Sequence, residues 1–491
     1  MDSASSSLAA IIETPAAYPQ DPPFHPDTHY PEFPGHRPLS RENGVFAAVR
    51  DLLAALRLDE ERFGTDSWNP LRAVVHAGDT VVIKPNLIRE SRLSDDSQWR
   101  QVITHGSVVR AVLDYVALAL GGSGTILIVD GPQTDSSFDA ICRLLGLCGL
   151  AEFYQQRGLD FSLLDLRRDE WENRGGVIVA RRELAGDPRG YCRFDLAQAS
   201  EFFGHCGAGR YYGADYDCDE LNGHHTGGRH EYLVSKTIVD ADVMFSIPKL
   251  KTHKKAGITG ALKNLVGING DKNWLPHHTE GTPADGGDER PDCRKSERNL
   301  VMGARRTLLR TPLIGNFLHR HARKAALRVF GSTEDVIRSG NWFGNDTVWR
   351  MCLDLNKILL YGDPSGTFRE DVPENRKRHI VLVDGIIAGE GSGPMNPDPV
   401  YSGAVAFGTN AASVDAACAV LIGFDPEKIP IVRQAFRCKH FPLTDWDWKD
   451  VKLVSNKPEW NGLLTDIPFK DTFHFEPHFG WKSHIERLEG K

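Results

Sequence analysis

A strand–helix–strand pattern early in the chain constrains the fold more than any other feature of the sequence. Asp79–Pro85 and Thr125–Val129 are short β-branched runs, typical of buried strands. Between them, Thr104 can cap a helix from Gly106 to about Leu120, whose valines recur on one face. A strand, a helix and a strand at this spacing predict a right-handed parallel crossover.

Two later runs extend this pattern. Asp242–Ile247 and His379–Val383 are again short and apolar, and a helix from Ala412 to Ile422 ends at Gly423, a common C-terminal signal. The sequence therefore predicts an α/β fold with largely parallel sheets and flanking helices, and with polar and helical insertions.

Changes of composition along the 491 residues divide the chain into five expected segments. These are an extended N-terminal arm (1–40), an α/β core (41–278) with a Gly- and His-rich insertion (170–230), a basic helical cap (279–345), a second α/β unit (346–440) and a C-terminal tail (441–491). The basic helical stretch of the cap runs from Leu300 to Phe330, and it can pack on the core or dock a partner.

Composition excludes several classes of protein. Hydrophobic residues make up 41% of the chain and charged residues 25%, as in globular proteins with a core. The net charge of -8 argues against nucleic-acid binding, and no apolar run is as long as a membrane span. The first residues lack the pattern of a secretory signal, and the nine cysteines include no CxxC pair that would indicate a local iron–sulfur or zinc motif. We expect a cytoplasmic protein.

The segment Phe245–Gly270 carries the strongest functional signal. It sets five lysines and one histidine among small residues: Lys249, Lys251, Lys254, Lys255, Lys263 and His253. Glycines allow a backbone to approach a ligand closely, and lysines make the place positive. We interpret this segment as the floor of a site for an anion; the alternative is a solvated basic loop.

Polar residues follow the expected strands where each one ends. Ligands of open α/β sheets bind beyond the carboxyl ends of the strands, so we expect the groups after Asp79–Pro85, Thr125–Val129, Asp242–Ile247 and His379–Val383 to converge. The residues predicted to contact a cofactor or anion are Lys84, Asn86, Lys249, Lys251, Gly257 and Gly260.

Three residues are predicted to be catalytic: His253, Lys263 and Glu390. His253 would transfer protons, and Lys263 would bind an anion or act covalently if burial lowers its pKa. Asp384 and Glu390 are expected to share one glycine-rich loop that follows His379–Val383, and they could hold a divalent metal or form an acid–base pair. His277 and His278 are further candidate metal ligands, and His105 is a further candidate acid or base. For Asp415, at the start of a helix, a structural role is expected.

Several common motifs are missing from the sequence. It contains no GxGxxG after a strand, no GxxxxGK[ST], no HExxH and no GxSxG at a strand-to-helix turn. The sequence therefore argues against a dinucleotide-dependent dehydrogenase, a P-loop NTPase or an α/β-hydrolase.

Taken together, these motifs resemble the domain of unknown function 362 family (DUF 362). The matching segments are Val81–Leu87, Thr104–Tyr115, Ile128–Pro132, Asp240–Ile268 and Val381–Pro426. Members of that family often carry an added ferredoxin-like cysteine cluster, and this chain lacks it. The resemblance therefore leaves an iron–sulfur redox role in doubt.

A more distant likeness is to nickel-pincer lactate racemases. Their motif of a histidine, a glycine-rich turn and a lysine is similar to His253, Ala256–Ala261 and Lys263, although Ala261 replaces a glycine. The likeness implies that the lysine tethers the pincer nucleotide and that the histidine moves protons. It also implies that a later histidine, His277 or His278, binds nickel.

We expect a cytoplasmic enzyme that acts on a small anionic metabolite by isomerisation or proton abstraction next to a carboxylate. A divalent metal or the nickel-pincer nucleotide would be its cofactor. The rival hypotheses are a non-catalytic binding or assembly protein, with a protein partner or a second copy of the chain, and an iron–sulfur redox protein.

Overall fold

The computed structural model describes residues 7–35, 39–174, 177–213, 217–292 and 336–488. The basic helical stretch expected at 300–330 lies outside these residues. Within them, the strands of the main sheet follow the order β18-β17-β1-β16-β14-β10-β2-β3-β4. Their bounds are β1 Leu8–Glu13, β2 Thr80–Pro85, β3 Thr125–Asp130, β4 Asp160–Asp165, β10 Val243–Ile247, β14 Arg378–Glu390, β16 Ala404–Gly408, β17 Lys452–Ser455 and β18 Gly462–Leu463.

The middle of this sheet is parallel, as the sequence predicted. β4, β3, β2, β10 and β14 pair in parallel, and α3 (Gly106–Leu120) forms the crossover from β2 to β3. The cap of α3 differs from the prediction: the side chain of His105 accepts the backbone N–H of Ser107. The hydroxyl of Thr104 instead donates a hydrogen bond to the carbonyl of Ile247. This bond links the turn after β2 to the end of β10.

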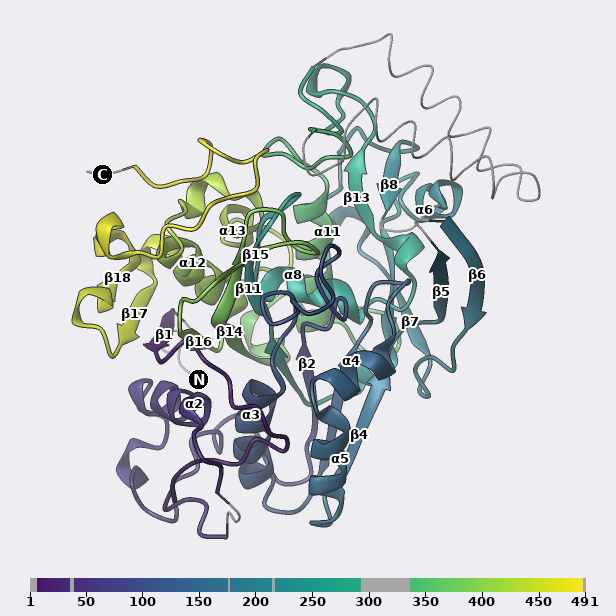
Figure 1. Ribbon diagram of the computed structural model, residues 1–491. Coiled ribbons are helices and arrows are strands. Elements are labelled where there is room, and N and C mark those ends of the chain that lie inside the picture. Colours follow the sequence, from purple (N-terminus) through teal and green to yellow (C-terminus); the bar gives the residue numbers. More distant parts are fainter. Residues whose placement is uncertain (1–6, 36–38, 175–176, 214–216, 293–335, 489–491) are drawn as a thin grey trace.

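Two hydrophobic cores lie on the two faces of the sheet (Figure 1). Alternate residues of a strand point to opposite faces, so Val81 and Ile83 join one core while Val82 joins the other. The core of Val81 holds α2, α3, α4 and α5, and the core of Val82 holds α8, α11, α12 and α13. Their bounds are α2 Gly44–Ala55, α4 Phe138–Leu144, α5 Leu147–Gln155, α8 Ala261–Asn264, α11 Val348–Tyr361, α12 Ala411–Leu421 and α13 Pro430–Ala435.

Both ends of the described chain contribute to the same sheet. β1, from the expected N-terminal arm, pairs with β16 on one side and with β17, from the expected tail, on the other (Figure 1). β10 and β14, from the two expected α/β units, are also direct neighbours. The segments 1–40, 41–278, 346–440 and 441–491 thus share one sheet.

The expected insertion at 170–230 forms small antiparallel sheets beside the main one. β5 pairs with β6, β7 with β9, and β8 with β13, while α6 and α7 lie between these strands in sequence. The bounds are β5 Asp169–Arg174, β6 Val177–Glu183, β7 Tyr191–Asp195, β8 Tyr211–Gly213, α6 Cys218–His224, β9 Glu231–Ser235, α7 Lys236–Asp240 and β13 Pro276–Thr279.

The lysine-rich segment continues directly from the parallel sheet. β11 (Lys249–His253) runs parallel to the later part of β14, and it turns back through β12 (Gly257–Thr259) into α8. β14 itself is longer than predicted: Gly385–Glu390 was expected to be a loop, but β11 and β15 (Asp398–Val400) pair with it and hold it extended.

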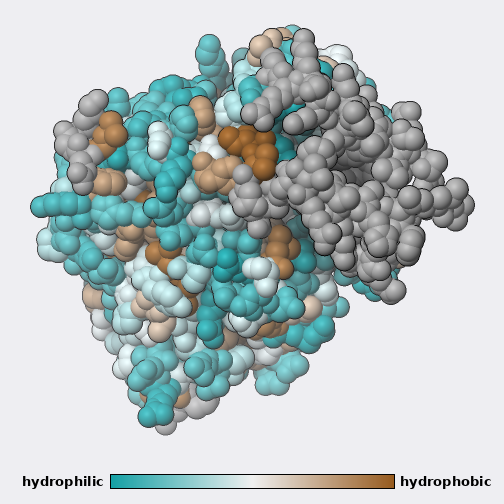
Figure 2. Space-filling view, turned by 45° about the horizontal axis from the view of Figure 1, so that its top comes forward, coloured by the Kyte–Doolittle hydropathy of each residue, from teal (hydrophilic) through white to brown (hydrophobic). Residues whose placement is uncertain are grey.

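The described surface is mainly hydrophilic on the face shown in Figure 2, with separate apolar patches. No helix among the residues that the structure describes is long and apolar enough to cross a membrane.

Candidate functional site

The carboxyl ends of β2 and β3 are joined by a buried ion pair. Lys84 Nζ lies 2.7 Å from Asp130 Oδ1, and it also donates a hydrogen bond of 3.2 Å to Asn264 Oδ1 in α8. The chain passes so close here that a Cβ atom at Gly267 would lie 2.0 Å from Asp130 Oδ1. Only glycine fits at that point. Close packing therefore accounts for Gly267, and no bound ligand is needed to explain it.

A second buried ion pair joins the start of β11 to the middle of β14. Lys249 Nζ donates to Asp384 Oδ2 at 3.0 Å and to the Tyr18 hydroxyl at 2.7 Å. Tyr18 in turn donates to Asp384 Oδ1 at 2.6 Å, and the backbone N–H of His105 donates to Asp384 Oδ2 at 2.9 Å. All of these groups satisfy one another.

His105 is held between two aromatic rings. Tyr18 stacks on it with 4.0 Å between ring centroids, and Trp99 stacks on it at 5.4 Å. Burial, with a smaller effect from Lys249, lowers the pKa of His105 well below its ordinary value, so this imidazole is neutral. Since its Nδ1 contacts Ser107 and its ring is enclosed, His105 has a structural position in this network.

Lys251 lacks such a carboxylate. β11 alternates, so Lys249, Lys251 and His253 share one side of the strand, and all three are buried. Lys251 Nζ donates to the carbonyl oxygen of Val102, and it forms no ion pair with any described residue. Burial and the neighbouring Lys249 and Lys263 lower the pKa of Lys251 well below its ordinary value.

Lys263 is more isolated still. It lies on α8, its side chain is 8% exposed, and its amine makes no hydrogen bond or ion pair with the described residues. Burial lowers the pKa of Lys263, and Lys84 lowers it further. The neighbouring thiol of Cys352 offers no negative charge, because burial raises its pKa to about 12.

Two histidines beside these amines have opposite tautomers. His253 Nδ1 accepts the backbone N–H groups of Lys255 and Ala256, each at 3.0 Å, so a neutral ring carries its proton on Nε2. His277 Nδ1 faces the carbonyl oxygen of Leu275 at 2.8 Å, so this ring carries its proton on Nδ1 and a lone pair on Nε2.

Both rings stay neutral near neutral pH. Burial lowers the pKa of each histidine well below 6.5, and Lys263 lowers the pKa of both. His277 also contributes to the lowered pKa of His253, so the two rings are neighbours. We call Lys251, His253, Lys263 and His277 the unpaired cluster.

Asp415 positions the helix that carries Lys263. Its two carboxylate oxygens accept the backbone N–H groups of Ala261 at 2.7 Å and Leu262 at 3.0 Å. Burial raises the pKa of Asp415 to about 7. A Cβ atom at Gly260 would lie 2.1 Å from Asp415 Oδ1, so this glycine makes room for the carboxylate.

Other predicted contact residues have packing or turn roles. The backbone N–H of Asn86 bonds to Ile247 and Thr104, and its side chain accepts the N–H of Ile88 at 3.4 Å. Gly257 has a φ of +82° and packs beside Trp481 of the C-terminal tail. No hydrogen bond joins either residue to Lys251, His253, Lys263 or His277 among the described residues.

The four predicted metal ligands do not form one group. Asp384 and Glu390 are six residues apart on β14, which at about 3.3 Å per residue separates them by roughly 20 Å. Glu390 accepts the N–H of Glu476 at 2.8 Å, and His278 Nδ1 lies 3.3 Å from Lys255 Nζ. Among the residues described, no three His, Cys, Asp or Glu side chains gather as metal ligands.

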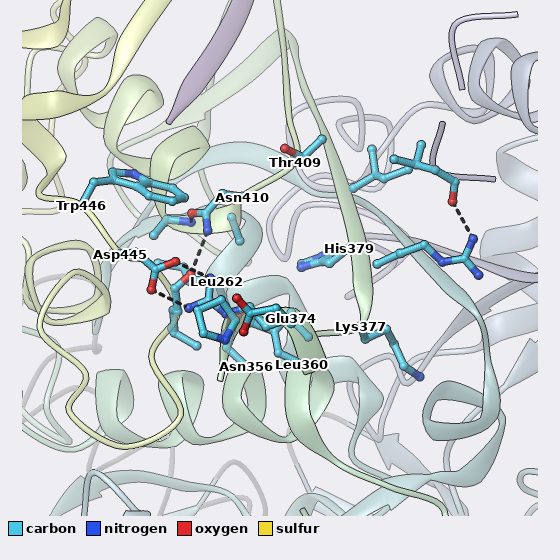
Figure 3. A pocket seen from close by; sticks show the side chains of 18 of the residues that line it. Leu262, Asn356, Leu360, Glu374, Lys377, His379, Thr409, Asn410, Asp445 and Trp446 are labelled. Atoms are coloured by element: carbon cyan, nitrogen blue, oxygen red, sulfur yellow. Dashed lines mark hydrogen bonds and ion pairs between the residues drawn. The ribbon is translucent and has the colours of Figure 1, made fainter. Parts of the chain in front are cut away.

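A cavity of about 490 Å³ lies at the other end of the parallel strands, where β14 and α12 both begin (Figure 3). Trp446, Asn410 and Asp445 lie on one side of it, and Lys377 and His379 lie on the other. Lys377 is buried and donates to the carbonyl oxygens of Ile238 and Val239. The buried amine at this cavity, Lys377, therefore has hydrogen-bond acceptors of its own, in contrast to Lys263 in the unpaired cluster.

Sequence reasoning missed two residues of this region. Tyr18 comes from the arm expected to be extended, and only the pairing of β1 in the sheet brings it to Lys249. Asp415 was expected to act on its own helix, but it binds the start of α8 instead. Neither contact has a local signal in the sequence.

Comparison with known proteins agrees with the motifs. Residues 204–420 match the family model described as a domain of unknown function (DUF362). The comparison with curated proteins gives no match. Among solved structures, the crystal structure of a protein from Thermotoga maritima is similar at 11% sequence identity over 71% of this chain, with a TM-score of 0.30. The chain spans 56% of the length of that protein.

The matched range includes β10, β11, α8 and β13, and so contains all four residues of the unpaired cluster. The segment of this chain from residue 204 to residue 420 matches the model of the DUF362 family, in agreement with its motifs.

Proposed function

We propose that the protein is an enzyme that binds a small anionic metabolite at the unpaired cluster and moves a proton close to its carboxylate. The observation that carries this proposal is the pair of buried amines, Lys251 and Lys263, which lack any carboxylate partner among the described residues. Lys84 and Lys249 lie beside them and do have such partners. Burying an amine without a counter-charge is costly, and function is a common reason for it.

An anion would supply the missing charge. A carboxylate beside the amine of Lys251 would favour its protonated form and raise its pKa. Lys251 is held by its hydrogen bond to the carbonyl of Val102, whereas the amine of Lys263 makes no such bond with a described residue. The bound metabolite would therefore be held at one end by Lys251.

The two histidines provide a base and a hydrogen-bond donor at the same place. His277 has an Nε2 lone pair that can accept a proton, and His253 has an Nε2–H that can donate a hydrogen bond to the negative charge that develops on the substrate. A base that takes a proton and gives it back, beside a donor that stabilises the intermediate charge, allows proton abstraction and return. This arrangement supports isomerisation or proton abstraction more than a purely binding role.

The likeness to nickel-pincer lactate racemases gives a second candidate function. The residues present fit the group: the Lys263 amine is free to carry it, and His277 Nε2 has a lone pair suited to nickel. When bound, such a group supplies a nickel centre for the racemisation of a 2-hydroxy acid. A hard divalent cation fits less well, because both oxygens of Asp384 are already bonded to Lys249, Tyr18 and backbone N–H groups.

Exchange of carbon-bound protons for deuterium tests the proposal. Purified protein would be incubated in D2O with lactate, malate, alanine or pyruvate, and loss of the proton signal would be followed by NMR. We expect exchange in at least one compound, its loss in Lys263→Ala, and a decrease of on the order of 10²–10⁴-fold in His253→Asn. The control Lys452→Ala changes an exposed lysine and should keep the wild-type rate. Full exchange by Lys263→Ala, or no exchange with any compound, would contradict it.

A further inference from the structure

Lys263 differs from every other buried lysine that the structure describes. The seven buried lysines are Lys84, Lys249, Lys251, Lys263, Lys272, Lys357 and Lys377. Each of the other six donates at least one hydrogen bond to a carbonyl or carboxylate oxygen. The amine of Lys263 has no such bond with a described residue, although Lys263 is buried, with 8% of the residue exposed.

A free, buried amine is suited to covalent chemistry. The other lysines of the site would have to give up an ion pair or a hydrogen bond before they could attack a carbon atom. Lys263 gives up nothing, and burial shifts it toward the neutral form, in which the nitrogen lone pair is available. A neutral amine attacks a carbonyl carbon, so a carbonyl compound is the matching class of substrate.

We propose that Lys263 forms an imine with a 2-oxo acid whose carboxylate lies against Lys251. This inference rests on the proposed function and names its class of substrate. The charge of Lys263 is among the causes that lower the pKa of Lys251, so the two side chains lie in one neighbourhood. A molecule with a carboxylate next to a carbonyl group offers a matching partner to each amine. Their separate contacts also give them separate roles, because Lys251 is fixed by Val102 and Lys263 is not.

The reaction balances without another reactant. Lys263 Nζ adds to the carbonyl carbon, and one nitrogen proton moves to the carbonyl oxygen, which gives a carbinolamine hydroxyl. The second nitrogen proton then joins this hydroxyl, which leaves as water, and the nitrogen lone pair forms the carbon–nitrogen double bond. His277 Nε2 can take each proton from the nitrogen and return it to the oxygen, while the neutral His253 Nε2–H donates a hydrogen bond to that oxygen.

The imine also deepens the proposed proton transfer. A carbon–nitrogen double bond withdraws electrons from the carbon next to it, so the protons on C3 of the 2-oxo acid become acidic. His277 Nε2 is the basic atom of the unpaired cluster that can accept one of them. Within this class of substrate, the proton that exchanges is therefore on C3.

Reductive trapping tests the inference directly. The full-length protein would be incubated with pyruvate or 2-oxoglutarate and sodium cyanoborohydride, which reduces an imine to a stable secondary amine. Intact mass should show one adduct per chain. Peptide mapping should place it on Lys263, where the modified lysine resists trypsin and joins Ala256–Lys263 to the peptide that follows.

Three variants sharpen the test. Lys263→Arg keeps a cation but cannot form the imine, so the adduct should disappear, whereas Lys452→Ala should leave it unchanged. Lys251→Met should lower trapping of pyruvate by at least about tenfold and leave trapping of acetaldehyde, which has no carboxylate, nearly unchanged. Circular dichroism spectra would verify that each variant is folded.

The outcomes separate this inference from the proposed function. If wild-type protein shows no adduct on Lys263 with either acid, or labels Lys263 no faster than exposed lysines, the imine is refuted even where deuterium exchange continues. If Lys263 is trapped selectively but no proton exchanges in any compound, the imine stands and the proton-transfer proposal fails. Equal trapping of pyruvate by Lys251→Met would refute the role of Lys251.

Discussion

At the scale of single residues, the site contains two kinds of buried lysine. Lys84 and Lys249 have carboxylate partners, whereas Lys251 and Lys263 have none among the described residues. A buried ion pair whose remaining hydrogen bonds are satisfied holds elements together. A buried amine without a counter-charge is costly, and a bound anion would remove that cost. This difference, rather than the number of lysines, separates the framework of the site from the groups that we propose to face a substrate.

Removing one partner of the framework should cost much stability. Lys249 and Asp384 are both 0% exposed, so Lys249→Ala leaves a buried carboxylate without its cation and should lower the free energy of unfolding by about 3 to 5 kcal/mol. Urea denaturation measures it. Lys457→Ala breaks an exposed pair with Glu13 and should cost less than about 1 kcal/mol. Equal losses in the two variants would mean that the Lys249 pair does not support the fold.

The buried histidines should make stability depend on pH. The pKa of His253 and of His277 lies well below 6.5 in the folded protein, so the unfolded chain binds more protons as the pH falls below 6.5. Their contribution to the free energy of unfolding is therefore complete above that pH and is lost progressively below it. In His253→Asn, urea denaturation at about pH 7 and about pH 5 should give a smaller difference than in wild type. A difference as large as in wild type would show that His253 does not titrate in this range.

At the scale of elements, the start of α8 is held by a carboxylate from α12. Asp415 bonds to the N–H groups of Ala261 and Leu262, and Gly260 leaves it room. Lys263 follows these residues by one or two positions, so the contact decides where its amine lies. Gly260 and Asp415 thus together fix the start of α8, although 155 positions separate them in the sequence.

A double-mutant cycle tests this contact. Gly260→Ala places a methyl group against Asp415 Oδ1 and should destabilise the fold by about 1 to 3 kcal/mol. In the background of Asp415→Ala, the clash is absent and the same change should cost clearly less. Free energies of unfolding from urea titrations supply the four values. Additive losses would show that the two residues do not interact.

Much of the element pattern could be predicted from the sequence, because buried parallel strands and their crossover helix have a local signature. β2, α3 and β3 are such elements. The second half of β14 could not, since Gly385 and Gly389 are typical of a loop and only pairing with β11 and β15 keeps this part extended. The same extension separates Asp384 from Glu390, which the sequence had placed in one loop.

At the scale of the whole molecule, residues far apart in sequence meet because the sheet has parallel strands. Lys84 and Asp130 lie at the carboxyl ends of the parallel strands β2 and β3, and Asp384 lies in the middle of the longer parallel strand β14. The convergence of lysines could be predicted from this rule. The contribution of Tyr18 could not, because it depends on β1 pairing between β16 and β17, a contact between the two ends of the described chain.

The N-terminal arm should therefore stabilise the framework. Tyr18→Phe removes the hydroxyl that bridges Lys249 and Asp384 and keeps the ring that stacks on His105. We expect a loss of about 1 to 3 kcal/mol in the free energy of unfolding, because two buried charges each lose a hydrogen bond. Differential scanning calorimetry should show a lower melting temperature than in wild type. An unchanged melting temperature would mean that the arm does not hold the ion pair.

The central claim is that Lys251 and Lys263 lack a counter-charge because a substrate supplies it. A crystal structure of the protein soaked with pyruvate tests this most directly, and the sodium cyanoborohydride treatment can fix an adduct in place. The account predicts electron density for the carboxylate at Lys251 and for the adjacent carbon at Lys263, within reach of His253 and His277. Density only in the cavity beside Lys377 and Trp446, with both amines of the unpaired cluster left without a ligand, would contradict it.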